Sequence, residues 1–135
     1  MIAGIPGHPV EDVKISNILI QHPGGGTRKD AALQLPEKEN EYPEPTMFGT
    51  TPAHAFYIRH AKRVEISDFK ILTQDKEERP CFILEDVDGV EFSNVKFPEG
   101  QQTPRFVLDE VKDVRVQRSR PVPDTEIKEA KRQEI

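Results

Sequence analysis

The side chains best suited to ligand chemistry lie between residues 28 and 60, where basic and aromatic residues are interspersed with prolines and carboxylates. Sugar rings stack on aromatic faces, and acidic sugars pair with Arg or Lys. An alternative for Tyr57 is packing in an outward apolar row with Ile83 and Val107, which would need a cover. Residues 23–54, the C-terminal tail or a second subunit could supply that cover. The candidates for carbohydrate contact are Arg28, Lys29, Tyr42, Phe48, Tyr57, Arg59 and His60.

The histidines and the single cysteine do not have the spacing of a recognised metal motif. His8, His22, His54 and His60 form no His-x-His or His-x-x-x-His pattern, and Cys-x-x-Cys is absent. Metal sites usually need at least three converging ligands, so we expect no metal ion and no cofactor. Cys81 cannot form an internal disulfide and is expected to be a small buried hydrophobe.

No residue is assigned a catalytic role. Glu85 and Asp109 should stack in adjacent repeats below Arg59, and an inverting glycosidase needs two carboxyl groups about 6.5–9.5 Å apart. A surface ladder of charges explains the same spacing. Three serines recur at one position of a repeat, which indicates a structural stack because a nucleophile would be unique: Ser16, Ser67 and Ser93.

The elements that position these side chains are predicted by a pattern that occurs four times. Val13-Lys-Ile-Ser-Asn-Ile-Leu-Ile20 returns at residues 64–71 and 90–97 and decays over residues 114–119. The last three first-position valines are 26 and then 24 residues apart, and a phenylalanine precedes each by eight residues. A period of roughly 20–50 residues is typical of solenoids.

Each repeat reads as strand, bend, strand, loop and strand. Apolar residues alternate on both sides of a Ser-Asn or Ser-Asp pair, and Asn and Asp tolerate the left-handed backbone of a tight bend. We therefore predict an all-β fold, a parallel β-helix of about four coils. Lys14, Glu65, Glu91 and Arg115 should line its outside. The predicted inward residues are Val64, Ile66, Phe69, Ile71, Phe82, Leu84, Val90, Phe92, Val95, Phe106, Leu108 and Val114.

The length of 135 residues predicts one domain. Residues 1–12 are a lead-in, residues 13–118 form the coils, and residues 119–135 form a tail. Residues 23–54 interrupt the coils, either as a coil with degraded spacing or as a long loop, with a candidate strand at 31–35. The tail is short, charged and helix-prone, with Asp124 or Thr125 as the N-cap; it would either cap the last coil or fray.

Charge and hydropathy narrow the range of partners. The net charge is −5 and no basic stripe with interleaved aromatics occurs, which argues against nucleic acid. No apolar run approaches 18 residues, and the N-terminus has no secretory-signal pattern, so no membrane partner is expected and the localisation stays open. The open ends of a short coil stack would recruit other copies, so we expect a homo-oligomer, a dimer or trimer.

Three segments resemble the family 28 glycoside hydrolases, the polygalacturonase-like enzymes of pectin breakdown: residues 4–13, 42–49 and 56–60. With the repeats, the resemblance covers roughly residues 3–118. It implies a right-handed parallel β-helix and a protein of a typically secreted or periplasmic family.

The part resembled is the C-terminal end of that family, as if the chain were truncated before the catalytic motifs. The family's Asn-Thr-Asp, Asp-Asp, Gly-His-Gly and Arg-Ile-Lys motifs are all absent from this sequence. The resemblance thus implies a module that is not catalytic as a pectinase and that binds pectic or related carbohydrate or serves as a scaffold. The alternative is a hydrolase, glycosidase or esterase, whose site is rebuilt at a subunit interface.

Overall fold

The computed structural model describes residues 1–44 and 46–135, so Pro45, inside the 42–49 segment, lies outside the described residues. The chain is almost entirely β, with one six-stranded sheet. No helix among the described residues is long and apolar enough to cross a membrane. The elements are β1 (Ile2–Ala3), β2 (Val10–His22), α1 (Arg28–Ala31), β3 (Phe56–Thr73), β4 (Phe82–Lys96), β5 (Phe106–Gln117) and β6 (Thr125–Glu134).

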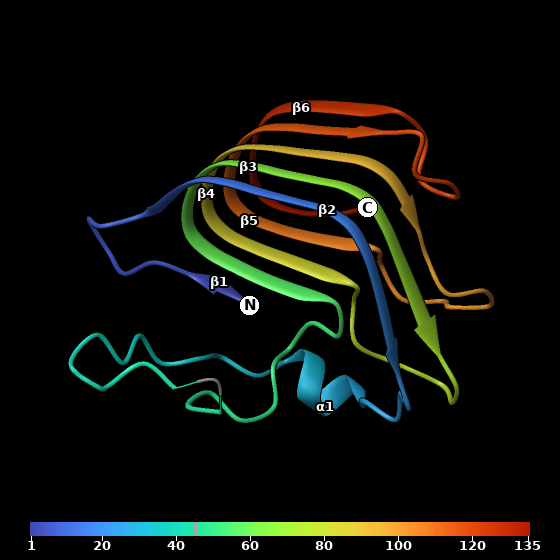
Figure 1. Cartoon of the computed structure of the whole chain (residues 1–135), viewed down its shortest axis with the longest axis horizontal. Helices are drawn as coiled ribbons and strands as arrows, with labels where there is room; N and C mark the ends of the chain where they lie inside the picture. The colour runs from blue at the N-terminus through green and yellow to red at the C-terminus, as the bar shows by residue number, and fades with distance from the viewer. Residues whose placement is uncertain (45) are drawn as a thin grey trace.

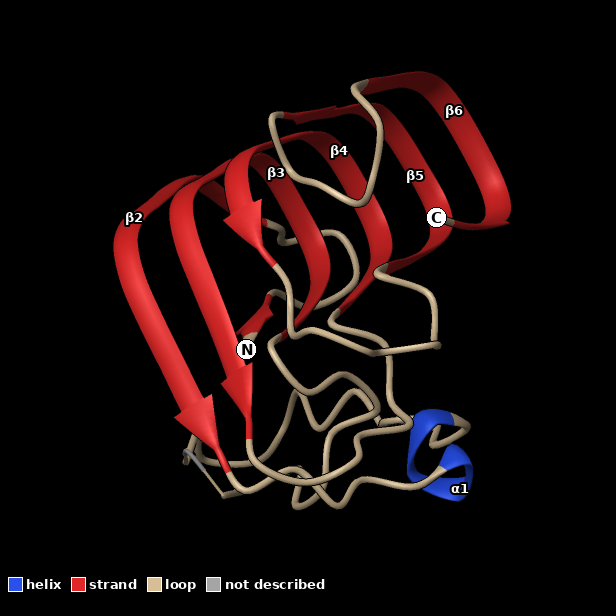
Figure 2. Cartoon of the chain, turned by 90° about the vertical axis from the view of Figure 1, so that its right-hand side faces the viewer, coloured by secondary structure: helices blue, strands red, loops and turns tan. Residues whose placement is uncertain are grey.

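The strands stack in the register that the repeat predicts. The sheet order is β1-β3-β4-β5-β6, with β2 also pairing with β3, and every pairing is parallel except the last. Val13 pairs with Val64, Val64 with Val90, and Val90 with Val114. Figures 1 and 2 show β3, β4 and β5 following the same curved path, one beside the next. Equivalent positions of successive repeats are therefore neighbours in space.

Left-handed residues bend each long strand at fixed positions. One ladder contains the predicted bend, with Asn17, Asp68 and Asn94 at φ of 58°, 51° and 55°. Two further bends were not predicted from the sequence. They consist of His60, Asp86 and Glu110, and of Asp12, Arg63, Gly89 and Asp113, all at positive φ.

The core is a column of apolar side chains inside these bends. All twelve residues predicted to point inward are buried. Phe82 is fully buried and stacks on Phe106 with ring centroids 5.1 Å apart, while Phe69 and Phe92 meet it edge-on. Lys14, Glu65 and Arg115 are exposed and Glu91 is half-buried, on the outer face as predicted.

Residues 23–44 and 46–54, which we call the inserted loop, are a long loop and not a coil, because β2 pairs directly with β3. The candidate strand at 31–35 is wrong. The short helix α1 ends at Ala31, and residues 32–35 have no regular secondary structure. The helix begins after its N-cap Thr27, where the Thr27 side chain and Asp30 cap each other's backbone N–H groups in a capping box. Farther along, Leu35 and Ala53 pack against Tyr57 and Ile83, so the loop covers the outward apolar row.

The C-terminal segment is also not a helix. It forms β6, antiparallel to β5, from Val116 opposite Thr125 to Val107 opposite Glu134. A helix of about a dozen residues is marginal in water, whereas the edge of β5 offers a row of unpaired backbone groups. Ala130 is buried against the core, and Ile127 packs on it, so the segment does cap the last repeat.

Candidate functional site

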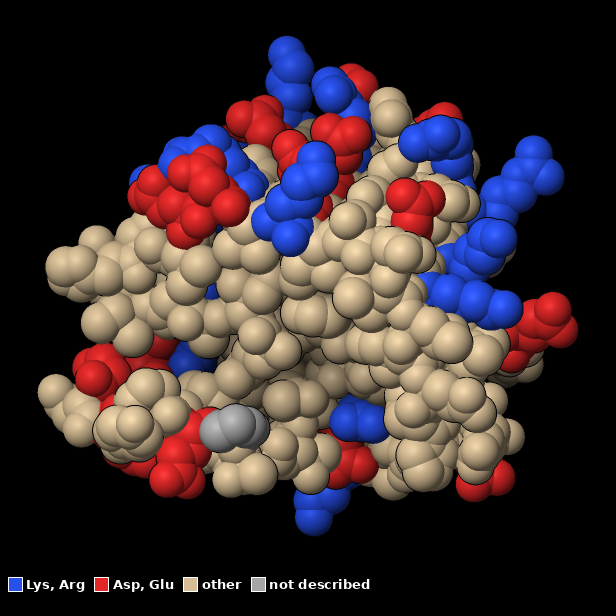
Figure 3. Space-filling model, viewed as in Figure 1, with Lys and Arg blue, Asp and Glu red and all other residues tan. Residues whose placement is uncertain are grey.

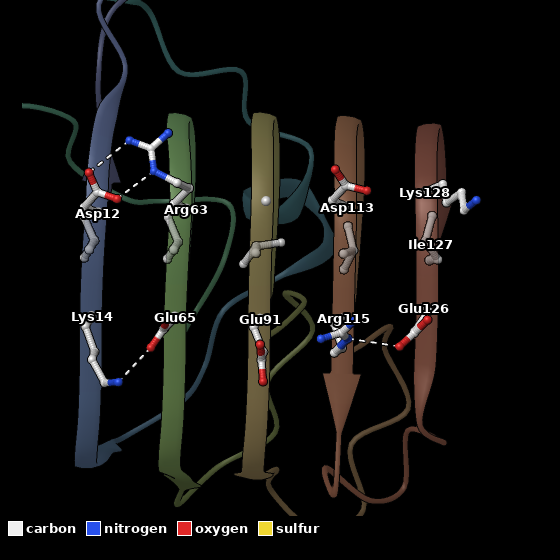
Figure 4. A pocket seen from close by; sticks show the side chains of 15 residues that line it. Asp12, Lys14, Arg63, Glu65, Glu91, Asp113, Arg115, Glu126, Ile127 and Lys128 are labelled. Atoms are coloured by element: carbon white, nitrogen blue, oxygen red, sulfur yellow. Dashed lines mark hydrogen bonds and ion pairs between the residues drawn. The ribbon is translucent and has the colours of Figure 1, made fainter.

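An extended concave surface lies on the outer face of the strands and has a volume of about 690 Å³. Figure 4 shows it as two rows of side chains across β2, β3, β4, β5 and β6. Stacking in register places Lys14, Glu65, Glu91 and Arg115 in one row, with Glu126 of β6 opposite Arg115. We call this surface the charged groove. Figure 3 shows acidic and basic side chains interspersed over the upper part of the molecule, where these strands run.

Ion pairs hold both ends of the charged groove. At the β2 end, Arg63 Nε lies 2.7 Å from Asp12 Oδ1, and Lys14 Nζ lies 2.8 Å from Glu65 Oε2. At the β6 end, Arg115 Nε lies 3.0 Å from Glu126 Oε1. Because these side chains are exposed, each pair contributes little to stability.

The middle of the charged groove differs from its ends. Gly89 lies between Arg63 and Asp113 in the second row, and its missing side chain leaves the floor open there. No hydrogen bond or ion pair joins the side chain of Glu91, Asp113 or Lys128 to any of residues 1–44 and 46–135. The groove thus presents two carboxylates and an ammonium group around a shallow hollow, ready to bond hydroxyl groups of a ligand.

Two sequence-predicted candidates, Tyr57 and Arg59, lie beneath the inserted loop. Both side chains are 2 % exposed. Arg59 donates hydrogen bonds to the carbonyl oxygens of Leu35 and Pro36, at 3.0 and 2.8 Å. Tyr57 donates to Glu85, and burial together with this hydrogen bond raises the pKa of Tyr57. Their polar groups are therefore occupied within the protein.

His60 lies at the rim of the same region and bridges two carboxylates. Its Nδ1 is 2.7 Å from Asp86 and its Nε2 is 3.2 Å from Glu37. Burial of the ring opposes protonation, but the hydrogen bonds to Asp86 and Glu37 outweigh it and raise the pKa of His60. The His60 ring thus ties the inserted loop to a bend of β4.

The remaining candidates are only partly assembled. Phe48 faces Arg59, with the guanidinium carbon 5.2 Å from the ring centroid. Arg28 and Lys29 lie on α1 and are exposed, and Tyr42 is 83 % exposed on the inserted loop. The structure therefore brings together Phe48, Tyr57, Arg59 and His60 but not the other three.

A second polar cluster joins residues far apart in the sequence. His22 Nε2 lies 3.0 Å from His54 Nδ1, and one atom each of His22, His54 and Glu77 lie within 4.8 Å of one another. Gln101 reaches His54 Nε2 at 3.3 Å. Arg79 binds the Glu77 carboxylate through Nε and one terminal nitrogen, at 2.8 and 2.9 Å.

His54 and Glu77 are buried, and burial and hydrogen bonding together set their protonation. Burial lowers the pKa of His54 to about 4, so the ring is neutral near pH 7. Burial alone would raise the pKa of Glu77, but hydrogen bonds from Arg79 outweigh it and lower the pKa to about 2. Cys81 is buried as expected, and burial raises the pKa of its thiol to about 12.

Sequence reasoning missed both the middle of the charged groove and the buried cluster. The sequence did contain an indication of the groove, because Gly89 and Asp113 interrupt the alternation of apolar and polar residues one position before Val90 and Val114. It contained none of the cluster, since His22 and His54 are 32 residues apart and Glu77 lies in a separate loop.

Comparison with family models, with curated proteins and with solved structures finds no match for this chain.

Proposed function

We propose that this chain is a parallel β-helix module that binds uncharged, hydroxyl-rich segments of pectic or related carbohydrate in the charged groove. The observation that carries the proposal is the pair of free carboxylates, Glu91 and Asp113, beside the open floor at Gly89. In this proposal the module resembles polygalacturonase-like enzymes in fold and lacks their catalytic residues.

The β-helix part of the proposal rests on the stacked register. Each of the valine, phenylalanine and serine positions pairs with its equivalent in the next repeat, as Ser16 does with Ser67 and Ser67 with Ser93. Three bends per repeat return the chain around one shared apolar column. This register and these bends support the proposal of a parallel β-helix, which the resemblance implies to be right-handed.

The choice of an uncharged ligand follows from which charges are free. The cations at the ends of the groove, Lys14, Arg63 and Arg115, are already paired with carboxylates. Glu91 and Asp113 are acceptors only, so they bond hydroxyl hydrogens and repel a uronate. Lys128 can donate to the sugar oxygens at the β6 side of the groove.

The test is a binding titration with two matched oligosaccharides, one neutral galactan and one oligogalacturonate. We expect the neutral ligand to bind more tightly, and Glu91→Gln and Asp113→Asn each to weaken its binding at least 5-fold. Glu129→Gln on β6, an exposed residue outside the groove, is the charge-matched control and should leave the affinity unchanged.

Reducing-end release and ester hydrolysis are measured on the same samples. We expect binding without turnover, in agreement with the missing family motifs. Turnover by the wild type would instead support a hydrolase. Failure of both sugars to bind, or equal binding by Asp113→Asn and wild type, would overturn the proposed function.

We also propose that the chain self-associates through β2. The outer edge of β2 has no strand partner among the described residues, and Leu19 on it is 61 % exposed. Unpaired edges with apolar side chains recruit further strands.

A further inference from the structure

The end of β2 and two loops converge on one point, where His54 and Glu77 are buried and His22 is half-buried. His22 ends β2, His54 lies two residues before β3, and Glu77 lies in the loop between β3 and β4. From this convergence we infer that His22, His54 and Glu77 bind a divalent transition-metal ion. The site is independent of the charged groove and of the function proposed for it.

The distances suit a metal ion of the zinc type. The donor atoms are 3.0 Å apart for the two histidines and within 4.8 Å for the full set. Ligands about 2.0–2.2 Å from a tetrahedral zinc ion are roughly 3.3 Å from one another. A contraction of at most about 1.5 Å at Glu77 therefore completes the site, which is within the reach of side-chain rotation.

The donor set matches the same ion. Two imidazoles and one carboxylate leave a fourth position open, and nitrogen with oxygen donors suits zinc and its neighbours in the first transition row. His54 is 9 % exposed and Glu77 is 7 % exposed, so neither is a freely rotating surface group. Asp75, Glu77 and Gln101 line a hollow of about 560 Å³ beside the cluster, which gives an ion a path from solvent.

Two backbone N–H groups of the glycine run at residues 24–26 hydrogen-bond to the proposed ligands His22 and Glu77, and metal binding would replace these bonds. The Gly24 N–H donates to His22 Nδ1 at 3.1 Å, so in the metal-free chain the His22 proton is on Nε2. The Gly26 N–H donates to Glu77 Oε2 at 3.2 Å, the longest of the four bonds to that carboxylate. Metal binding moves the His22 proton from Nε2 to Nδ1 and breaks both glycine bonds.

The approach of this loop is close enough to need glycine. A Cβ on Gly26 would lie 2.0 Å from Glu77 Oε1, and one on Gly24 would lie 2.5 Å from the Asp75 carbonyl oxygen. Glycine also moves between backbone conformations at low cost, so the loop can leave the cluster when the metal enters. On the other side, the Gln101 amide can accept the His54 Nε2–H after a half-turn, as second-shell groups commonly do.

The first experiment titrates Zn²⁺ into the untagged, chelator-treated chain against a chromophoric competitor. We expect one site per chain. His22→Ala, His54→Ala and Glu77→Gln should each weaken binding at least 10-fold, whereas His8→Ala, an exposed histidine outside the cluster, should not. Circular dichroism checks that each variant is folded.

The second experiment needs only the wild type, so it decides the matter even if a variant fails to fold. Co²⁺ should give the intense visible absorption of a tetrahedral site. Zn²⁺ should shift the His22 ring proton to Nδ1 in long-range ¹⁵N spectra and remove the hydrogen-exchange protection of the Gly24 and Gly26 amides. Absence of a stoichiometric Co²⁺ spectrum, or equal Zn²⁺ loss in His8→Ala and His54→Ala, would overturn the inference.

Discussion

Among single residues, Arg59 does the most to hold the inserted loop. Its guanidinium reaches three consecutive carbonyl oxygens, those of Leu35, Pro36 and Glu37. These carbonyls belong to a segment with no regular secondary structure, so the sheet cannot satisfy them. The loop is therefore fixed to β3 by side-chain hydrogen bonds and by the apolar contacts of Leu35.

His60 adds a contact to the same loop that depends on pH. The raised pKa of His60 means that the folded state binds the proton more tightly than the unfolded state does. The stabilisation is fully present below the unfolded pKa of about 6.5 and is lost as the pH rises through the folded pKa. We expect His60→Gln to lower the free energy of unfolding by about 0.5–1 kcal/mol at pH 5.5 and by much less at pH 8.5.

Urea unfolding of wild type and His60→Gln at the two pH values measures this difference. His8→Gln, which changes an exposed histidine, is the control and should match the wild type at both. An equal loss at pH 5.5 and 8.5 would mean that the ring acts by packing and not by charge.

The types of these residues could be read from the sequence, but their surroundings could not. The aromatic residue at 57 and the basic residues at 59 and 60 are the types expected in a sugar-binding site. The same types are expected equally in residues that anchor a loop. Burial decides between the two, and it depends on where residues 35–37 fold back. The repeat carries no information on that path, because the inserted loop lies outside it.

Among the elements, the bends show where the repeat was informative. The bend at Asn17, Asp68 and Asn94 was predicted because Asn and Asp favour the left-handed backbone. The bend that includes His60 and the bend that includes Arg63 were not predicted, since the residue types along each of these two ladders vary from one repeat to the next. These residues adopt positive φ because the neighbouring repeats, paired through the sheet, bend at the same positions.

The C-terminal element illustrates a different limit. Residues 124–135 have good helix propensity, but propensity is a weak signal that tertiary context overrides. The edge of β5 supplies backbone partners to Thr125–Glu134, and the core supplies a buried place for Ala130. Neither could be known before the stack itself was placed.

The phenylalanine column should carry a large part of the stability. Phe82 is fully buried and contacts the rings of four other phenylalanines. We expect Phe82→Ala to lower the free energy of unfolding by about 3–5 kcal/mol, because it leaves a cavity in the centre of the stack. Tyr42→Ala, at an exposed position, should cost less than about 0.5 kcal/mol. Chemical denaturation monitored by circular dichroism measures both changes. An unchanged midpoint for Phe82→Ala would show that the phenylalanine column does not stabilise the fold.

Over the whole molecule, the two ends of the stack are protected differently. The outer strand β6 carries Lys128, Glu129, Lys131 and Arg132, and such charges discourage further strand addition. At the other end, β2 has Ile18 and Leu19 exposed, and Val13 and Ile15 only half-buried. The apolar column is thus closed at the β6 end and open at the β2 end.

This asymmetry leads to the prediction that the chain forms a homo-oligomer through β2. A two-fold axis beside β2 would pair it with its own copy and place one open column end against the other, which makes a closed dimer the simplest assembly. Light scattering at micromolar concentration should give a dimeric or trimeric mass. Leu19→Lys, on the open edge, should shift that mass to the monomer, while Tyr42→Lys, an even more exposed site on the inserted loop, should not. A monomeric mass for the folded wild type would contradict the prediction, because the β2 edge would then be stable in water without a partner.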